Sequence, residues 1–313
     1  MTKSFPTTWS EHDQKVRYYF WCHRVLGITS KILSLFLFVS FLIHYRFQKM
    51  EAYWSDLDFP SLFVWLLFFG ALGFIWEVVL FPFSISHHYI ERAFGLSKQS
   101  YGSWFKDRLK GYGVGAVLGT LALSLVFLTI QWGGENWWVF TAIGFILLSV
   151  ILAQLAPVLL IPLFFKLKPL ENGELKDRLL ALSQKFGVTV KEVFHLGMGE
   201  KTEKGNAAFV GLGETKRILL GDTLYQKFPA DEVEAVFAHE LGHQVHRDLI
   251  KGIIFSGVLM FFSFFVTQLL VEEWVFPTFK TSKEFSFGML LFFVCFSLIQ
   301  IPLGVFRAIF SRQ

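Results

Sequence analysis

Six long apolar stretches constrain the fold of this chain more than any other feature. Each is close to the roughly 20 residues that a helix needs to cross the hydrocarbon core of a bilayer. A large soluble helical core is the alternative. However, 53% of the residues are hydrophobic and 17% are charged, so there is too little polar sequence to cover six such stretches. We therefore predict membrane spans at Val25–His44, Pro60–Pro82, Gly113–Gln131, Trp137–Phe164, Ile253–Val271 and Phe285–Phe306.

Aromatic and basic residues suggest how these spans are oriented. Tyr53, Trp132 and Trp274 lie near span ends, as in the aromatic belts of membrane interfaces. Most of the 29 Lys and Arg residues fall on the side that carries residues 83–112 and 165–251. Because basic loops favour the cytoplasmic side, we expect that side to face the cytoplasm. This excess of basic residues on one side of the lipid bilayer explains the net charge of +4. The charge therefore does not call for a nucleic-acid partner.

The spans divide the chain into three regions. Residues 1–164 are expected to form an N-terminal membrane region with about four spans. Residues 251–313 would form a C-terminal membrane region with about two spans. Residues 165–250 are the long polar stretch between them. We therefore predict a multi-pass α-helical membrane protein with a cytoplasmic α+β domain at residues 165–250.

Local patterns predict the elements of this polar domain. Leucines repeat at helical spacing in Glu171–Gly187, which indicates an amphipathic helix. Val188–Met198 is rich in strand-forming residues. Ala207–Leu212 and Arg217–Leu220 flank a short polar turn and predict a β-hairpin. A second helix is expected from Asp231 to about Leu249.

That second helix contains the pentapeptide His239-Glu240-Leu241-Gly242-His243. Residues four apart lie on one face of a helix, so His239 and His243 can bind one Zn²⁺ ion. Glu240 would then be placed to act as a general base on a water molecule at the metal. These residues predict a zinc metallopeptidase with the HExxH motif. A buried helix whose two histidines are capped by neighbouring groups is the alternative.

The rest of this helix fits the same interpretation. Gly242 costs about 1 kcal/mol relative to alanine in the middle of a helix, which suggests that metal or backbone approaches it closely. A packed face is expected to consist of Val233, Val236, Phe237, Leu241 and Val245.

Two further groups of residues are candidates for the site. His246 and Asp248 follow the motif and could orient a metal-binding imidazole by contacting the side of the ring away from the metal. The alternative is that they are ordinary solvated or packed side chains. Asn206, Ala207, Ala208 and Phe209 could form an exposed edge strand that binds a peptide substrate through its backbone. An ordinary buried strand is an equal alternative for these four residues.

Several separated segments carry a resemblance to a known family. Residues 204–249 contain N-A-A-F-V-G, K-R-I-L-L-G-D-T-L and D-E-V-E-A-V-F-A-H-E-L-G-H in that order. Residues 91–100 add E-R and F-G-L-S-K-Q-S, and residues 161–175 add I-P-L-F and K-P-L-E-N-G-E-L. Together they resemble the integral-membrane zinc metallopeptidases of the type I CAAX prenyl protease family. The resemblance runs from about Pro60 to the end of the chain.

The resemblance implies roles for several residues. His239 and His243 would be zinc ligands, Glu240 the general base, and Asn206 and Ala207 part of the strand that binds substrate backbone. The family encloses its catalytic site in a large water-filled chamber within the membrane. Its members cut near the C-termini of prenylated proteins, or cut other membrane-associated peptides.

The chain departs from the family pattern at two places. The family supplies a third zinc ligand from a glutamate in the pattern Ser-Arg-x-x-Glu, whereas this chain ends Phe310-Ser311-Arg312-Gln313. That ending predicts a chain truncated before its third ligand, with weaker zinc binding than three protein ligands provide. Lys204-Gly205 precede Asn206, where eukaryotic members often have His-Ser.

These departures leave two other functions open. One is a catalytically incomplete membrane protein that binds peptides, which the expected loss of a ligand favours. The other is a quality-control protease for membrane proteins, although such relatives usually have fewer spans.

Overall fold

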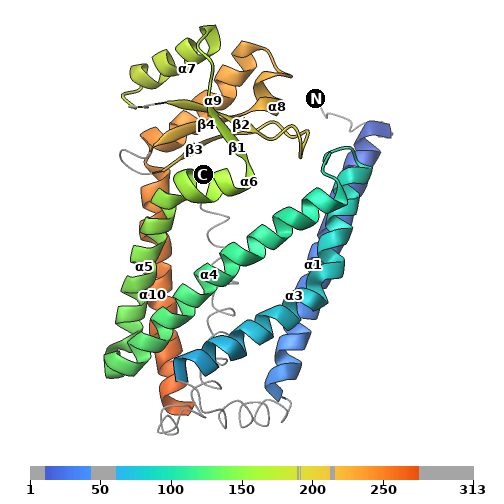
Figure 1. Cartoon of the computed structure of the whole chain (residues 1–313). Coiled ribbons are helices and arrows are strands. Elements are labelled where there is room, and N and C mark those ends of the chain that lie inside the picture. The colour runs from blue at the N-terminus through green and yellow to red at the C-terminus, as the bar shows by residue number, and fades with distance from the viewer. Residues whose placement is uncertain (1–10, 44–60, 189, 191, 212–215, 275–313) are drawn as a thin grey trace, which may run out of the picture.

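A computed structural model of the chain describes residues 11–43, 61–188, 190, 192–211 and 216–274, and long helices dominate it (Figure 1). A small sheet with short helices lies at one end of these long helices, and the helices extend away from it (Figure 1). The long helices are α1 (Glu11–Ile43), α3 (Ser61–Ala93), α4 (Tyr101–Gly133), α5 (Trp137–Leu155) and α10 (Asp248–Trp274).

The long helices carry the expected apolar spans. Within the described ranges, three helical stretches are long and apolar enough to cross a membrane: Leu62–Ala93, Tyr101–Phe164 and Asp248–Leu269. The expected span Val25–His44 falls on α1, except for His44, which lies outside the described residues. The expected span Phe285–Phe306 lies wholly outside them.

The stretch Tyr101–Phe164 is a helical hairpin rather than one helix. Ser100 begins α4 by accepting a hydrogen bond from the backbone of Ser103 at 3.2 Å. Gly134 reverses the chain with a positive φ of 53°, a conformation in which glycine avoids the penalty of a side chain. The 3₁₀ turn η1 (Gly134–Asn136) then leads into α5. Beyond α5, the π-helical turn η2 (Ala156–Leu160) and α6 (Ile161–Phe164) deliver the chain to the sheet.

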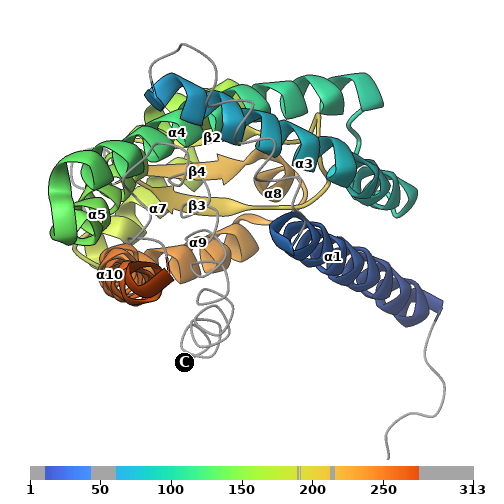
Figure 2. The ribbon, with the colours of Figure 1, turned by 90° about the horizontal axis from the view of Figure 1, so that it is seen from below.

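Aromatic side chains hold the long helices together at the end far from the sheet. Trp137 and Phe264 are buried there between α5 and α10. The indole N–H of Trp137 donates to the side-chain oxygen of Gln268, which satisfies a polar group inside this apolar cluster. Figure 2 shows α5 and α10 side by side, with α1 separate from them and next to α3.

The described residues form a sheet of four strands in the order β1-β2-β4-β3. They are β1 (Lys166–Pro169), β2 (Val193–Gly197), β3 (Ala207–Val210) and β4 (Arg217–Gly221). β2 and β4 are parallel, whereas β1 and β3 are antiparallel to their neighbours. The predicted hairpin of β3 and β4 is confirmed, with Ala208 opposite Leu219.

β4 is the most deeply buried strand because both of its faces are covered. Ile218 and Leu220 point to one side, where α7 (Glu174–Lys185) and α9 (Ala230–Val245) pack on the sheet. Leu219 points to the other side, towards residues of α6 and β1. A run of three apolar residues therefore fits a strand that is covered on both faces. β4 leads directly into the short helix α8 (Asp222–Tyr225).

The expected helix at Glu171–Gly187 is present as α7, but the next helix is shorter than predicted. α9 ends at Val245 rather than continuing to Leu249. Arg247 has a φ of 55°, a left-handed conformation that ends a helix. α10 then begins at Asp248. The motif helix and the membrane-length helix that follows are thus separated by a sharp turn.

The predicted packed face of α9 is partly wrong. Val233, Phe237 and Leu241 are buried in the core. Val236 and Val245 are exposed, because the face that packs on the sheet is narrower than the sequence analysis assumed. The expectation that backbone closely approaches Gly242 is also wrong, because a Cβ at this position would meet no protein atom within 4 Å.

Phe237 and Val236 offer a matched test of this burial. Replacing fully buried Phe237 with alanine should lower stability by about 3–5 kcal/mol, because a large cavity would remain under the sheet. Val236→Ala, one residue away and 38% exposed, should cost less than about 1 kcal/mol. Thermal unfolding in detergent, followed by tryptophan fluorescence, measures both. Equal melting temperatures for the two variants would contradict this packing.

Two glycines give opposite expectations for substitution by alanine. A Cβ at Gly221 would lie 2.8 Å from the carbonyl oxygen of Asn206, so Gly221→Ala should destabilise the start of β3 by about 1–3 kcal/mol. Gly242→Ala has free space and should stabilise α9 by up to about 1 kcal/mol. The same unfolding assay compares them. A stabilised Gly221→Ala protein would show that this contact is not tight.

Candidate functional site

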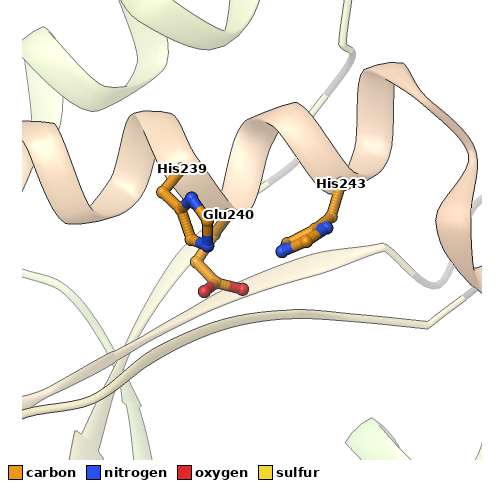
Figure 3. A group of neighbouring side chains, drawn as sticks. All are labelled: His239, Glu240 and His243. Carbon is orange, nitrogen blue, oxygen red and sulfur yellow. The ribbon is translucent and has the colours of Figure 1, made fainter. Parts of the chain in front are cut away.

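The side chains of His239, Glu240 and His243 meet on one side of α9 (Figure 3). One ligand-type atom from each residue lies within 4.8 Å of the other two. The centroids of the two imidazole rings are 4.9 Å apart. Both histidines are exposed and Glu240 is half-buried, whereas Phe237 and Leu241 are buried and anchor α9 in the core. The i, i+4 spacing therefore brings three polar groups to an accessible face of a firmly packed helix.

Asp248 lies behind one of these imidazoles. Its carboxylate Oδ2 is 2.8 Å from Nδ1 of His243, and this hydrogen bond leaves Nε2 of the ring available to another ligand. Residues five apart point about 140° away from each other on a continuous helix, so a straight helix would not allow this contact. The turn at Arg247 makes it possible. Asp248 was expected to support an imidazole, and the structure places it where it can do so.

The residues present suit a zinc ion. Two imidazole nitrogens and a neighbouring carboxylate are groups that zinc binds. A metal-binding histidine commonly donates its second nitrogen to a carboxylate, as His243 can do to Asp248. His246, the other expected supporting residue, is exposed at the end of α9, where its backbone N–H donates to the carbonyl of Gly242 at 2.9 Å.

The strand expected to bind substrate lies next to this helix. Within the described part of the chain, β3 is at the edge of the sheet, because it pairs with β4 and the order of strands ends with it. The ring of Phe209 stacks on that of Phe237 at 5.5 Å and 27°, which joins β3 to α9. Ala207 is buried, Ala208 and Phe209 are half-buried, and Asn206 is exposed. Ala207, Ala208 and Phe209 therefore lie in an edge strand that α9 partly covers, whereas Asn206 lies just before the strand begins.

Ion pairs fix the start of α9. Arg178 of α7 donates to Glu234 at 2.8 Å and to Asp231 at 2.6 Å. Hydrogen bonds to these two carboxylates raise the pKa of Arg178 above its usual value. Asp231 and Glu232 also lie in the first turn of α9, where negative charge is favourable.

Asp222, which no sequence motif singles out, holds the chain that leads into β3. Its Oδ1 accepts hydrogen bonds from the backbone of Met198 at 2.8 Å, Gly199 at 2.9 Å and Thr223 at 2.8 Å. A Cβ at Gly199 would lie 3.1 Å from this carboxylate. The only local signal for this role is an aspartate that directly follows a buried strand.

Comparisons with known proteins match both halves of the chain. Residues 8–166 match the CAAX prenyl protease N-terminal domain, described as having five membrane helices. Residues 169–312 match peptidase family M48. The second match begins close to the start of the sheet and includes α9.

Individual proteins show the same relationship. The chain is 27% identical to "Uncharacterized metalloprotease YhfN" of Bacillus subtilis over 78% of this chain and 57% of that protein. It is 26% identical to "Probable CAAX prenyl protease 1" of Schizosaccharomyces pombe over 84% of this chain and 60% of that protein. The chain thus spans somewhat more than half the length of these relatives.

A solved structure extends the likeness to three dimensions. The crystal structure of S. mikatae Ste24p superposes with a TM-score of 0.80 and 27% identity. The match covers 97% of this chain and 75% of that one. With both halves matched by one family and the fold shared along almost its whole length, this chain belongs to the M48 peptidases that carry a CAAX prenyl protease N-terminal membrane domain.

Proposed function

We propose that this chain is a membrane-embedded zinc metalloendopeptidase that cuts CAAX-type or other membrane-associated peptides. The observation that carries this proposal is the meeting of His239, Glu240 and His243 within 4.8 Å, beside the edge strand β3. Membership of a peptidase family that is matched over residues 169–312 supports the same conclusion.

The metal would be held by the two imidazoles. His239 and His243 each offer a nitrogen, and Asp248 orients His243 through the 2.8 Å hydrogen bond at Nδ1. Zinc bound there would supply a Lewis acid that polarises the scissile carbonyl and acidifies the attacking water.

Glu240 would move the proton. It adjoins His239 in sequence, and a carboxylate oxygen lies within 4.8 Å of both imidazoles, so it can reach a water molecule at the same place. Its carboxylate accepts the proton of that water and returns it to the leaving amine as the peptide bond breaks.

β3 would hold the substrate. An edge strand has unpaired backbone groups along one side, and an extended peptide can pair with them. The residues that offer this pairing are Asn206, Ala207, Ala208 and Phe209. The ring of Phe209 in β3 stacks on that of Phe237. Phe237 lies about one helical turn before Glu240 in α9, so a peptide bound along β3 would lie near Glu240.

We place this site on the cytoplasmic side and within reach of lipid-anchored substrates. The Lys and Arg residues concentrate on the side of the membrane that carries the sheet, as expected of a cytoplasmic face. The names of the relatives include CAAX prenyl protease, so a C-terminal peptide with a prenylated cysteine is the first substrate to test. An unprenylated peptide of the same sequence shows whether the lipid is needed.

Glu240→Gln tests the proposed base. The amide cannot accept the proton, so turnover of the test peptide should fall by at least about 10³-fold, while zinc content stays unchanged. Glu232→Gln makes the same change on the exposed first turn of the same helix and should have no effect. Cleavage by purified Glu240→Gln protein at the wild-type rate would refute this mechanism.

Zinc content per chain tests the metal site independently of turnover. We expect about one zinc in the wild type and loss of zinc in His239→Ala. Asp248→Ala should weaken zinc affinity about 10- to 100-fold, because His243 loses its orienting partner. His246→Ala should change affinity little. If the wild type holds no zinc, the alternative of a peptide-binding protein without catalysis is favoured.

A further inference from the structure

The segment that leads into β3, residues 198–206, is joined to the loop between α3 and α4, residues 94–100. Ser97 and Thr202 form an antiparallel bridge. The backbone N–H of Lys98 donates to the carbonyl of Lys201 at 3.0 Å, and that of Glu203 donates to the carbonyl of Leu96 at 3.1 Å. Two segments about a hundred residues apart in sequence thus pair like short strands.

Ion pairs reinforce this connection. Lys201 Nζ lies 2.5 Å from Asp107 of α4 and 2.6 Å from the carbonyl oxygen of Phe164 at the end of α6. Lys204 contacts Glu91 of α3 at 3.1 Å. Side chains of Lys201 and Asp107 are both only 21% exposed, so solvent screens this pair less than a pair on the open surface.

Lys204 itself is held charged by its partner. Burial alone would lower the pKa of its ammonium group, but the hydrogen bond and charge of Glu91 outweigh burial and raise it. Lys201 and Lys204 thus each face a carboxylate on a membrane-length helix, Asp107 of α4 and Glu91 of α3 respectively.

Both ends of segment 198–206 are also bound to the β4–α8 junction. Asp222 holds the backbone of Met198 and Gly199, and the hydroxyl of Thr223 donates to the carbonyl of Lys204 at 2.7 Å. The N–H of Gly221 then donates to the carbonyl of Asn206 at 2.8 Å. On one side the segment is therefore bound to α3, α4 and the loop between them. On the other side it is bound to the β4–α8 junction, immediately before β3 begins.

We propose that Lys201 and Asp107 are positioning residues that set β3 in register for substrate binding. This rests on the proposed function, in which β3 pairs with the peptide. β3 pairs with β4 along one side. Its first residue directly follows segment 198–206, so the position of that segment determines where β3 begins. A displacement of about 1 Å in a substrate-positioning element can reduce catalysis about 100-fold. The pair at α4 thus couples the membrane helices to the site without touching the reacting atoms.

Steady-state kinetics of zinc-loaded full-length protein test this coupling. Lys201→Ala and Asp107→Ala should each lower kcat/KM about tenfold or more, chiefly through a higher KM, with zinc content unchanged. Lys201→Arg keeps the charge and should restore most of the activity. Glu200→Ala is the matched control, because the 2.7 Å pair of Glu200 with Lys166 lies on the open surface of the same region.

Hydrogen exchange of residues 205–210 supplies a readout that needs no catalysis. Lys201→Ala and Asp107→Ala should speed exchange there relative to the wild type, and Glu200→Ala should not. If alanine at either position prevents folding, Lys201→Arg and the milder Asp107→Asn are compared in the same way.

The two readouts separate this proposal from the proposed function. The alanine variants could exchange faster than a wild type that neither binds zinc nor cleaves peptide. That result would support the positioning role and overturn the proposed function. Wild-type exchange in both alanine variants, or a KM no higher than that of Glu200→Ala, would overturn the positioning role while leaving the peptidase intact.

Discussion

Lipid offers no hydrogen-bond partner to a peptide group, and this constraint governs the architecture of the chain. A sheet with an open edge cannot face hydrocarbon, because each unpaired backbone group there would cost several kcal/mol. The four strands accordingly gather at one end of the long helices (Figure 1). The edge strand β3, whose unpaired side is useful for binding a peptide, is kept next to α9. Placing the polar elements together also concentrates the charged residues at the junction between helices and sheet.

Many of those charges face one another rather than lipid or solvent. Lys201, Lys204 and Arg108 lie on the side where the sequence shows an excess of basic residues, and they pair with Asp107, Glu91 and Glu77 respectively. A count of Lys and Arg indicates orientation, but it does not show which of them are engaged inside the protein. Lys201 and Lys204 thus attach the segment before β3 to α4 and α3, whereas Arg108 joins α4 to α3.

The sequence predicted the elements whose signals are local. The i, i+4 spacing of His239 and His243 placed both imidazoles on one face of a helix, and two apolar runs around a polar turn predicted the β3–β4 hairpin. β1 was missed because Lys166-Leu167-Lys168-Pro169 has no strand pattern, and it is a strand only through its pairing with β2. The link between residues 94–100 and 198–206 was missed for a related reason. Contacts across a hundred residues leave no periodicity in either segment.

The end of α9 shows how one residue limits such prediction and what it implies for the molecule. The sequence of residues 244–249 does not predict that Arg247 adopts a left-handed conformation. Because of that turn, His243 lies in α9 and its partner Asp248 lies in α10. Asp248 is the first residue of a helix long enough to cross the bilayer. A water-soluble piece that ended at Val245 would keep both imidazoles but lose the group that orients one of them. The candidate metal site therefore needs the first residue of α10, so a fragment that ends with α9 cannot reproduce it.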